Sequence, residues 1–207
     1  MPARPAAGDR VGTPYWLPPA VRHYAPGVTA LRFPPVLAAW ATVAAELVNT
    51  RPRETDPPEK LAALGDLERL LAQCPEPAPA TGQGDLEPVR ALRPVLLAGF
   101  EAGTADAFAD AVNPLLARGR GGWRMTPDPD GRWALAPAAD ERVADWLGAR
   151  AARGLAELVI AYGVERLHIC AADDCMCAAV DVSRNGTRRF CSRTCANRTN
   201  VRRHRAR

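Results

Sequence analysis

Apolar residues recur every three or four positions through five stretches of the chain, and this spacing predicts amphipathic helices. Several stretches carry helix start or stop signals, such as an aspartate followed by proline at the start of the second and a glycine at the end of the fifth. The predicted helices run from Pro35 to Val48, from Asp56 to Cys74, from Asp85 to Phe100, from Thr104 to Leu116 and from Ala138 to Gly163.

Two short alternating runs interrupt the helical pattern. Residues 123–126 and 132–136 flank the turn sequence PDPDG, which predicts a β-hairpin. We expect Trp123 and Trp133 in these runs to pack in the core rather than bind a base or a ligand. Residues 1–34 contain many prolines and glycines and no hydrophobic period, so they predict a loop-rich N-terminal arm.

The pattern therefore predicts an α+β fold. A mostly helical domain with a β-hairpin covers residues 35–163, and a small C-terminal module covers residues 164–207, with residues 164–168 as the linker. Of the 207 residues, 47% are hydrophobic, which suffices for one moderate core. We expect the helical domain to fold without the C-terminal module, because its helices and hairpin supply a core of their own.

Four cysteines in the C-terminal module stand as two close pairs. Cys170 and Cys175 have the spacing C-x4-C, Cys191 and Cys195 have the spacing C-x3-C, and 15 residues between the pairs are enough for a short hairpin. Two such pairs can supply the four ligands of a tetrahedral structural zinc ion. Ser192 is a natural N-cap, so the second pair should open a helix. We predict a treble-clef-like zinc finger built from a knuckle, a hairpin and a helix.

Two disulfides or four free thiols are the alternative interpretation of these pairs. The N-terminus lacks a charged start followed by an apolar segment, so we expect a cytoplasmic protein, and disulfides seldom persist in a reducing compartment. Cys177 and His168 each lie two residues from a predicted ligand, so either could take a ligand position instead. We interpret Cys177 as a small buried or spare thiol and His168 as a packed or solvated side chain. Cys74 stands alone and is interpreted as a small buried thiol.

The charge of the chain is divided unevenly. The formal net charge is +4, but residues 183–207 contain nine arginines and no acid, which leaves the rest of the chain, with 18 basic and 23 acidic residues, at −5. A basic end on an acidic body indicates a polyanionic partner, with a solvated charged tail as the alternative. The longest mostly apolar run, residues 36–48, is too short to span a bilayer, so no membrane partner is expected.

The C-terminal module resembles the CGNR-type zinc finger of bacterial regulators. The resemblance rests on the cysteine pairs, the run DVSRNGTRRFCS, the tetrapeptide CANR at residues 195–198 and the ending VRRHRAR. Ala196 replaces the glycine of CGNR, and alanine is the better helix former. Upstream, residues 46–50 followed by RPRETDPPEKL resemble the start of the ABATE domain. There Asn49 and Thr50 fit a helix stop and turn at least as well as a ligand-binding role.

Both resemblances imply a DNA-binding transcription regulator. The finger would bind double-stranded DNA, and the helical domain would sense a signal, with a small-molecule effector as a candidate partner, or mediate association. We interpret Arg198 and Arg202 as base-reading residues, while the flanking arginines contact phosphates. Asn197 is a candidate reader of adenine, with a polar role within the helix as the alternative. The candidate nucleic-acid-binding residues are Arg188, Arg189, Asn197, Arg198, Arg202, Arg203, Arg205 and Arg207.

RNA or ribosome binding by the same basic finger is the alternative function, since charge alone does not distinguish the two nucleic acids. A protein-interaction module with a structural zinc is a further alternative. We expect no enzyme and no catalytic residue, because four thiolates close the metal site and the chain contains no nucleophile elbow, phosphate loop or HExxH motif.

Overall fold

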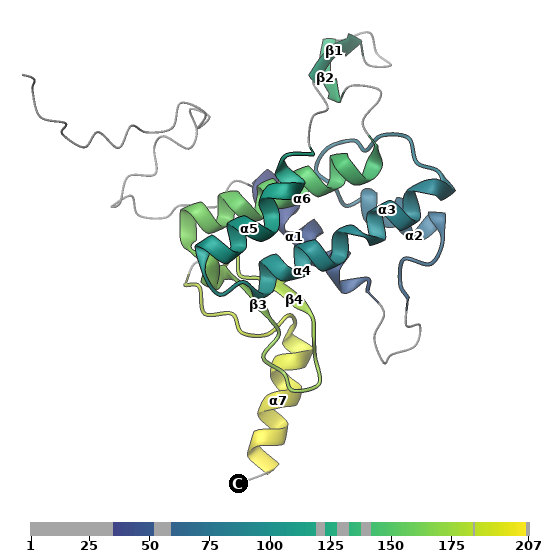
Figure 1. Ribbon diagram of the computed structural model, residues 1–207. Coiled ribbons are helices and arrows are strands. Elements are labelled where there is room, and N and C mark those ends of the chain that lie inside the picture. Colours follow the sequence, from purple (N-terminus) through teal and green to yellow (C-terminus); the bar gives the residue numbers. More distant parts are fainter. Residues whose placement is uncertain are drawn as a thin grey trace, which may run out of the picture. The chain divides into compact units, whose positions relative to one another are not determined.

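A computed structural model describes residues 35–51, 59–118, 123–127, 133–137, 142–183 and 185–205, with the side chains of residues 123–127 and 133–137 left out. The described residues combine α-helices with two antiparallel two-stranded sheets, which confirms the predicted α+β class (Figure 1). The predicted arm lies outside the described residues. The helices are α1 (Pro35–Asn49), α2 (Leu64–Leu71), α3 (Leu86–Arg90), α4 (Leu92–Glu101), α5 (Ala105–Leu116), α6 (Val143–Tyr162) and α7 (Arg193–Arg205), and the strands are β1 (Trp123–Pro127), β2 (Trp133–Pro137), β3 (Leu167–Ile169) and β4 (Ala178–Val180).

The centre of the core is the contact between α1 and α6. Trp40 and Trp146 are almost completely buried there, and their rings meet edge to face with centroids 5.2 Å apart. A Cβ atom on Gly154 of α6 would lie 2.6 Å from the Trp40 Cβ and 2.8 Å from the Ala41 backbone nitrogen. Glycine at residue 154 therefore allows the two helices to approach this closely.

Helix α2 begins later than the sequence predicts. The expected start at Asp56 lies outside the described residues, and Leu61 lies outside the helix although it is fully buried. The carboxylate of Asp66 accepts hydrogen bonds from the Ala62 and Ala63 amides at 2.9 and 2.8 Å. These bonds satisfy amides ahead of the first helical turn, so Asp66 marks the start of the helix.

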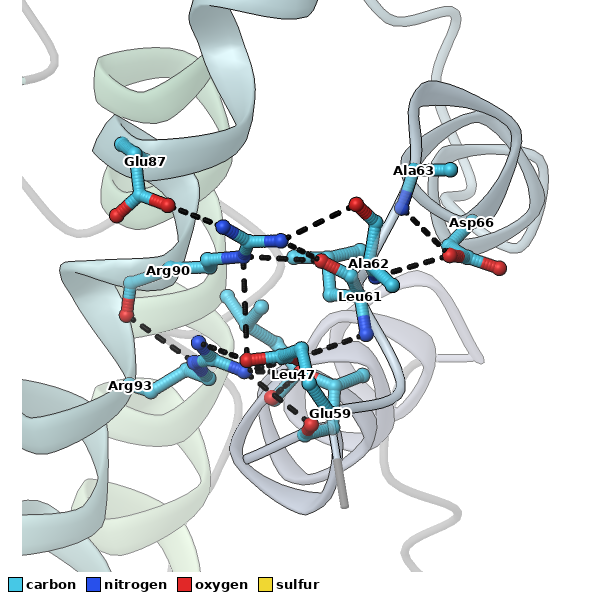
Figure 2. Close-up of polar contacts among 10 residues, drawn as sticks. Leu47, Glu59, Leu61, Ala62, Ala63, Asp66, Glu87, Arg90 and Arg93 are labelled. Carbon is cyan, nitrogen blue, oxygen red and sulfur yellow. Dashed lines mark hydrogen bonds and ion pairs between the residues drawn. The ribbon is translucent and has the colours of Figure 1, made fainter. Parts of the chain in front are cut away.

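The helix predicted from Asp85 to Phe100 is interrupted at Ala91, between α3 and α4. Pro94 is the physical reason, because it has no N–H to donate to the Arg90 carbonyl and its ring would crowd that oxygen. The side chain of Arg93 donates to the Arg90 carbonyl instead, at 3.2 Å. In Figure 2 the side chains of Arg90 and Arg93, on either side of this break, point toward Glu59, Leu61 and Ala62.

Three other local predictions are confirmed. Thr104 caps α5 by accepting a hydrogen bond from the Ala107 amide at 3.3 Å. Gly163 ends α6 with a φ of 91°, and its amide donates to the Val159 carbonyl at 2.8 Å. The strands β1 and β2 pair antiparallel as the expected hairpin. The side chains of Trp123 and Trp133 are outside those described, so their packing in the core stays a prediction.

The apolar core continues past Gly163 into the C-terminal module. Strands β3 and β4 pair antiparallel, with Leu167 opposite Val180, and both residues are buried in the same core as the helices, together with Ala178. The stretch predicted as a linker is therefore a 3-10 turn followed by the first residues of β3. A strand of three residues is too short to show an alternating pattern, which is why the sequence did not reveal it. The elements from α1 to α7 belong to one compact unit.

Candidate metal centre and basic helix

The first cysteine pair lies in the connection between β3 and β4, which we call the knuckle (residues 170–177). The Cys170 amide donates to the Cys177 carbonyl at 2.8 Å, and the Cys175 amide donates to the Ala172 carbonyl at 2.9 Å. The expected hairpin thus encloses the first pair instead of lying between the two pairs. Beyond β4 the chain becomes polar and carries no alternating apolar residues to form a second strand.

The second cysteine pair opens α7, as the sequence predicts. Cys191 precedes the helix, Ser192 is its N-cap, and Cys195 lies in its first turn. The Ser192 hydroxyl oxygen accepts a hydrogen bond from the Cys195 amide at 3.2 Å. The cap fixes the direction of the helix with respect to the two sulfur atoms.

The four predicted ligands come together at one point. The sulfur atoms of Cys170, Cys175, Cys191 and Cys195 all lie within 4.8 Å of one another. The Cys191 sulfur is 3.7 Å from that of Cys175 and 3.6 Å from that of Cys195. Tetrahedral zinc with Zn–S bonds of about 2.3 Å requires sulfur–sulfur edges of about 3.8 Å, whereas a disulfide requires about 2.05 Å. The cluster therefore fits a structural zinc ion, and all four residues are free thiols.

Burial opposes ionisation at two of the four thiols in the cluster. Burial raises the pKa of Cys175 to about 12 and also raises the pKa of Cys191, because a thiolate without a counter-charge is poorly solvated there. A hydrogen bond from the Ser192 side chain lowers the pKa of Cys195. Since zinc binds thiolates, metal binding at this site releases protons and offsets the repulsion between the sulfurs.

The other cysteines and the nearby histidine lie outside the four-sulfur cluster. Cys177 is half-buried and packs against it, while Cys74 lies just after α2 and packs against the main core. Burial raises the pKa of the Cys74 thiol to about 12, as expected for an inert thiol. His168 is half-buried in β3, and burial lowers its pKa.

A buried carboxylate that sequence reasoning missed holds the loop between β4 and α7. Asp181 is 2% exposed and accepts hydrogen bonds from the Ser183 and Arg188 amides, both at 2.8 Å. Burial raises its pKa, but these hydrogen bonds and the nearby Arg166 guanidinium bring the pKa below the usual value. The signal in the sequence was a single aspartate immediately before a long stretch without acids.

Residues at and just beyond the C-terminal end of α1 form hydrogen bonds with β4 and with the knuckle. The Asn49 side chain donates to the Ala178 carbonyl and accepts from the Ala178 amide, both at 2.9 Å, so it pairs with β4 as a neighbouring strand would. The Arg51 guanidinium donates to the Met176 carbonyl at 2.5 Å. Asn49, which resembled a helix stop, is thus a direct contact between α1 and the hairpin that carries the first cysteine pair.

A second layer of polar contacts supports this turn. Arg93, which is 8% exposed, forms a two-pronged ion pair with Glu59 at 2.8 and 3.0 Å and donates to the Thr50 carbonyl at 3.2 Å. Arg90 donates to the Leu61 carbonyl at 2.9 and 2.6 Å, as Figure 2 shows. Hydrogen bonds therefore link α4 to Thr50, and its chain neighbour Asn49 is in turn bonded to the first residue of β4.

The candidate nucleic-acid-binding residues are in three different situations. Asp174 in the knuckle pairs with Arg198 at 2.6 Å and with Arg202 at 2.9 Å, and the same Arg198 nitrogen lies 3.7 Å from the Cys195 sulfur. The Arg188 guanidinium donates to backbone carbonyls at the start of α7. The side chains of Arg189, Asn197, Arg203 and Arg205 are exposed, and Arg207 lies outside the described residues.

Two family models match the chain, and together they cover the helices and the metal site. The model described as "Putative stress-induced transcription regulator" (ABATE) matches residues 41–162. The chain belongs to the ABATE family. The model described as "CGNR zinc finger" matches residues 166–207, which confirms both predicted resemblances. No curated protein matches the chain.

The hydrogen bonds of Asn49 cross the boundary between the two matches. The ABATE match ends with α6 and the CGNR match begins just before β3, so the bonds between Asn49 and Ala178 join the two matched regions. The chain is thus a zinc-finger member of a regulator family. In the described part of the chain, none of the helices has the length and apolarity needed to cross a bilayer.

Proposed function

We propose that this ABATE protein is a zinc-dependent, DNA-binding transcription regulator whose C-terminal finger binds duplex DNA. The observation that carries the proposal is the attachment of α7 to the four-sulfur cluster through Cys195. The first turn of this helix supplies a metal ligand, and the part beyond Thr199 is exposed on every side up to Arg205. Among the described residues, the only ion pair of this exposed part joins Arg202 to Asp174, so the helix can enter the major groove, which admits an α-helix.

Charge supports the same partner. Residues 183–207 hold nine arginines and no acid, while the rest of the chain carries −5. Helix α7 has 13 residues and so is about 20 Å long, enough to follow a groove across several base pairs. A depression of about 460 Å³ at its start is lined by Arg188, Arg189 and Arg193 among others, and it offers a place for backbone phosphate.

The helical region is proposed to sense a signal, such as a small-molecule effector, or to mediate association. The support is structural: Asn49 bonds the backbone of β4 and Arg51 bonds the knuckle backbone, so a change at the end of α1 can reach the segment that carries the first cysteine pair. In this proposal the protein acts in the cytoplasm, and the finger is a treble-clef variant with its knuckle in the turn of the hairpin. The zinc is structural, since four sulfurs leave no open position for a substrate.

Fluorescence anisotropy with zinc-loaded protein and a labelled duplex of random sequence tests the proposal. Each neutralised phosphate contributes about −0.9 to the slope of log K against log salt, so the double substitution Arg203→Ala and Arg205→Ala should flatten the slope by up to about two. Replacing the exposed neutral Val201 by alanine serves as the control and should leave the slope unchanged.

Competition with a structured RNA hairpin separates the two nucleic acids. The proposal expects duplex DNA to displace the labelled duplex at lower concentration than the RNA does. A protein that prefers the RNA would be an RNA-binding zinc protein, and one that binds neither nucleic acid would leave protein interaction as the role of the finger.

A further inference from the structure

We infer that the base-reading surface of α7 is the stripe formed by Arg193, Asn197, Asn200 and His204, which we call the outer stripe. The inference rests on the proposed DNA-binding function and specifies the helix face that meets the base edges. It keeps Asn197, which the sequence interpretation named as a candidate reader of adenine, but it removes base reading from Arg198 and Arg202.

Helix geometry defines the outer stripe. Its residues are spaced by four, three and four positions, so they line up along one side of a helix with 3.6 residues per turn. The opposite side carries Cys195 and Thr199, which are 7% and 6% exposed. All four residues of the stripe are exposed, and no residue of the described chain forms a hydrogen bond or ion pair with their side chains. The stripe therefore faces away from the metal centre.

Arg198 and Arg202 lie on a different flank and are held toward the metal. Both pair with Asp174, and Arg198 also lies within hydrogen-bonding distance of the sulfur of a zinc ligand. For Arg198 to read a base it would have to leave both the carboxylate and the sulfur. We assign it as a positioning residue that ties α7 to the knuckle, and we assign Asp174 as a competitor for phosphate at both arginines.

The chemistry of the outer stripe suits the major groove. Arginine pairs with the two acceptors of guanine, and asparagine pairs with the donor and acceptor of adenine. Asn197 and Asn200 lie three residues apart, less than one turn, so they would meet neighbouring base pairs. Arg193 also lines the depression with Arg188 and Arg189, so the reading face begins beside the proposed phosphate site.

Selection from a duplex pool with a randomised centre tests the assignment, using the zinc-loaded full chain. Asn197→Ala and Asn200→Ala should each erase the preference at one base pair, a loss of roughly 5- to 150-fold in discrimination, without changing the salt slope. Arg202→Ala should keep every base preference. Zinc content and helicity should equal those of the wild type in all three, because the substituted side chains are exposed.

Asp174→Asn, with Asp173→Asn as its matched control, tests the competition at the arginines. Freeing both arginines should steepen the salt slope by up to about two and raise affinity for any duplex by no more than about fivefold per pair, since exposed ion pairs are weak. Asp173 is exposed, and no ion pair joins it to another described residue, so its variant removes the same charge without releasing an arginine.

Each outcome decides between specific alternatives. Base preferences that survive both asparagine substitutions but disappear in Arg202→Ala would overturn the outer stripe, as would a wild-type protein that binds duplexes without any base preference. In both cases DNA binding itself would stand. A wild-type protein that binds no duplex would instead overturn the proposed function, and the outer stripe with it.

Discussion

The helical region and the C-terminal module are held together by different forces. Helices α1 to α6 bury tryptophans, leucines and valines in one apolar core, whereas the small core around the knuckle consists of the cysteines, Ala172 and Phe190. The line between these two cores does not coincide with the end of α6. It runs through the zinc finger, because β3 and β4 belong to the helical core, while the small core joins the knuckle to the first turn of α7.

The largest effect should follow from Cys191→Ser, which removes one zinc ligand. Structural zinc contributes an apparent ~10–16 kcal/mol in small fingers, so we expect loss of bound zinc and of the order of α7, with most helical signal retained. Metal analysis and circular dichroism measure both. Cys177→Ser is the control and should keep the metal; stoichiometric zinc in the Cys191 variant would contradict the ligand assignment.

Leu167→Ala should show that the first strand of the finger belongs to the helical core. Leu167 is 5% exposed, and truncating a buried leucine costs about 2–5 kcal/mol. Urea unfolding of the helical signal measures the change in free energy of unfolding. The control Val182→Ala lies in the same module but is exposed, and it should have little effect. Equal, small effects from both variants would instead support the expectation of a self-sufficient helical domain.

Asn49→Ala should weaken the attachment of β4, and of the knuckle that precedes it, to α1. It leaves the buried Ala178 amide and carbonyl without their partner, which costs about 1–3 kcal/mol, and it should also speed zinc release to a chelator. Asn113→Ala at an exposed position of α5 is the matched control. If zinc were released at the wild-type rate, Asn49 would stabilise the fold without supporting the knuckle.

The smallest effect is expected for the ion pair between Glu59 and Arg93, and it should depend on pH. Burial raises the pKa of Glu59, but hydrogen bonds from Arg93 and the Leu61 amide bring it below its ordinary 4.5. A lowered folded pKa contributes stability above the unfolded value and loses it as pH falls through the folded value. Glu59→Gln should therefore cost about 1 kcal/mol at neutral pH and progressively less below pH 4.5. A difference from wild type that stays constant with pH would assign the effect to packing.

The parts of the structure that the sequence predicted are those with a local signal. The cysteine spacings, the Ser192 and Thr104 caps and the glycine at the end of α6 each act within a few residues, and the structure confirms them. The helical stripes likewise predicted the burial of Trp40 and Trp146.

The parts that the sequence did not predict depend on distant partners or on very short elements. Nothing near Asn49 indicates that its amide pairs with Ala178, 129 residues away. The pairing of Asp174 with Arg198 and Arg202 depends on how the knuckle and α7 are oriented by the metal site. The division of the chain at residue 163 stays a prediction, although β3 and β4 lie in the helical core.

The distance along the chain between Asn49 and Ala178 bears on how the protein is made. A ribosome adds about 5–20 residues per second, so α1 waits on the order of ten seconds for β4 to emerge. Until then the end of α1 and the apolar positions that receive Leu167 and Val180 stay exposed to water and to chaperones. Contacts of such long sequence separation slow folding, because the loop between the partners must close first. The contact between α1 and β4 therefore forms only after the chain has been synthesised past Val180.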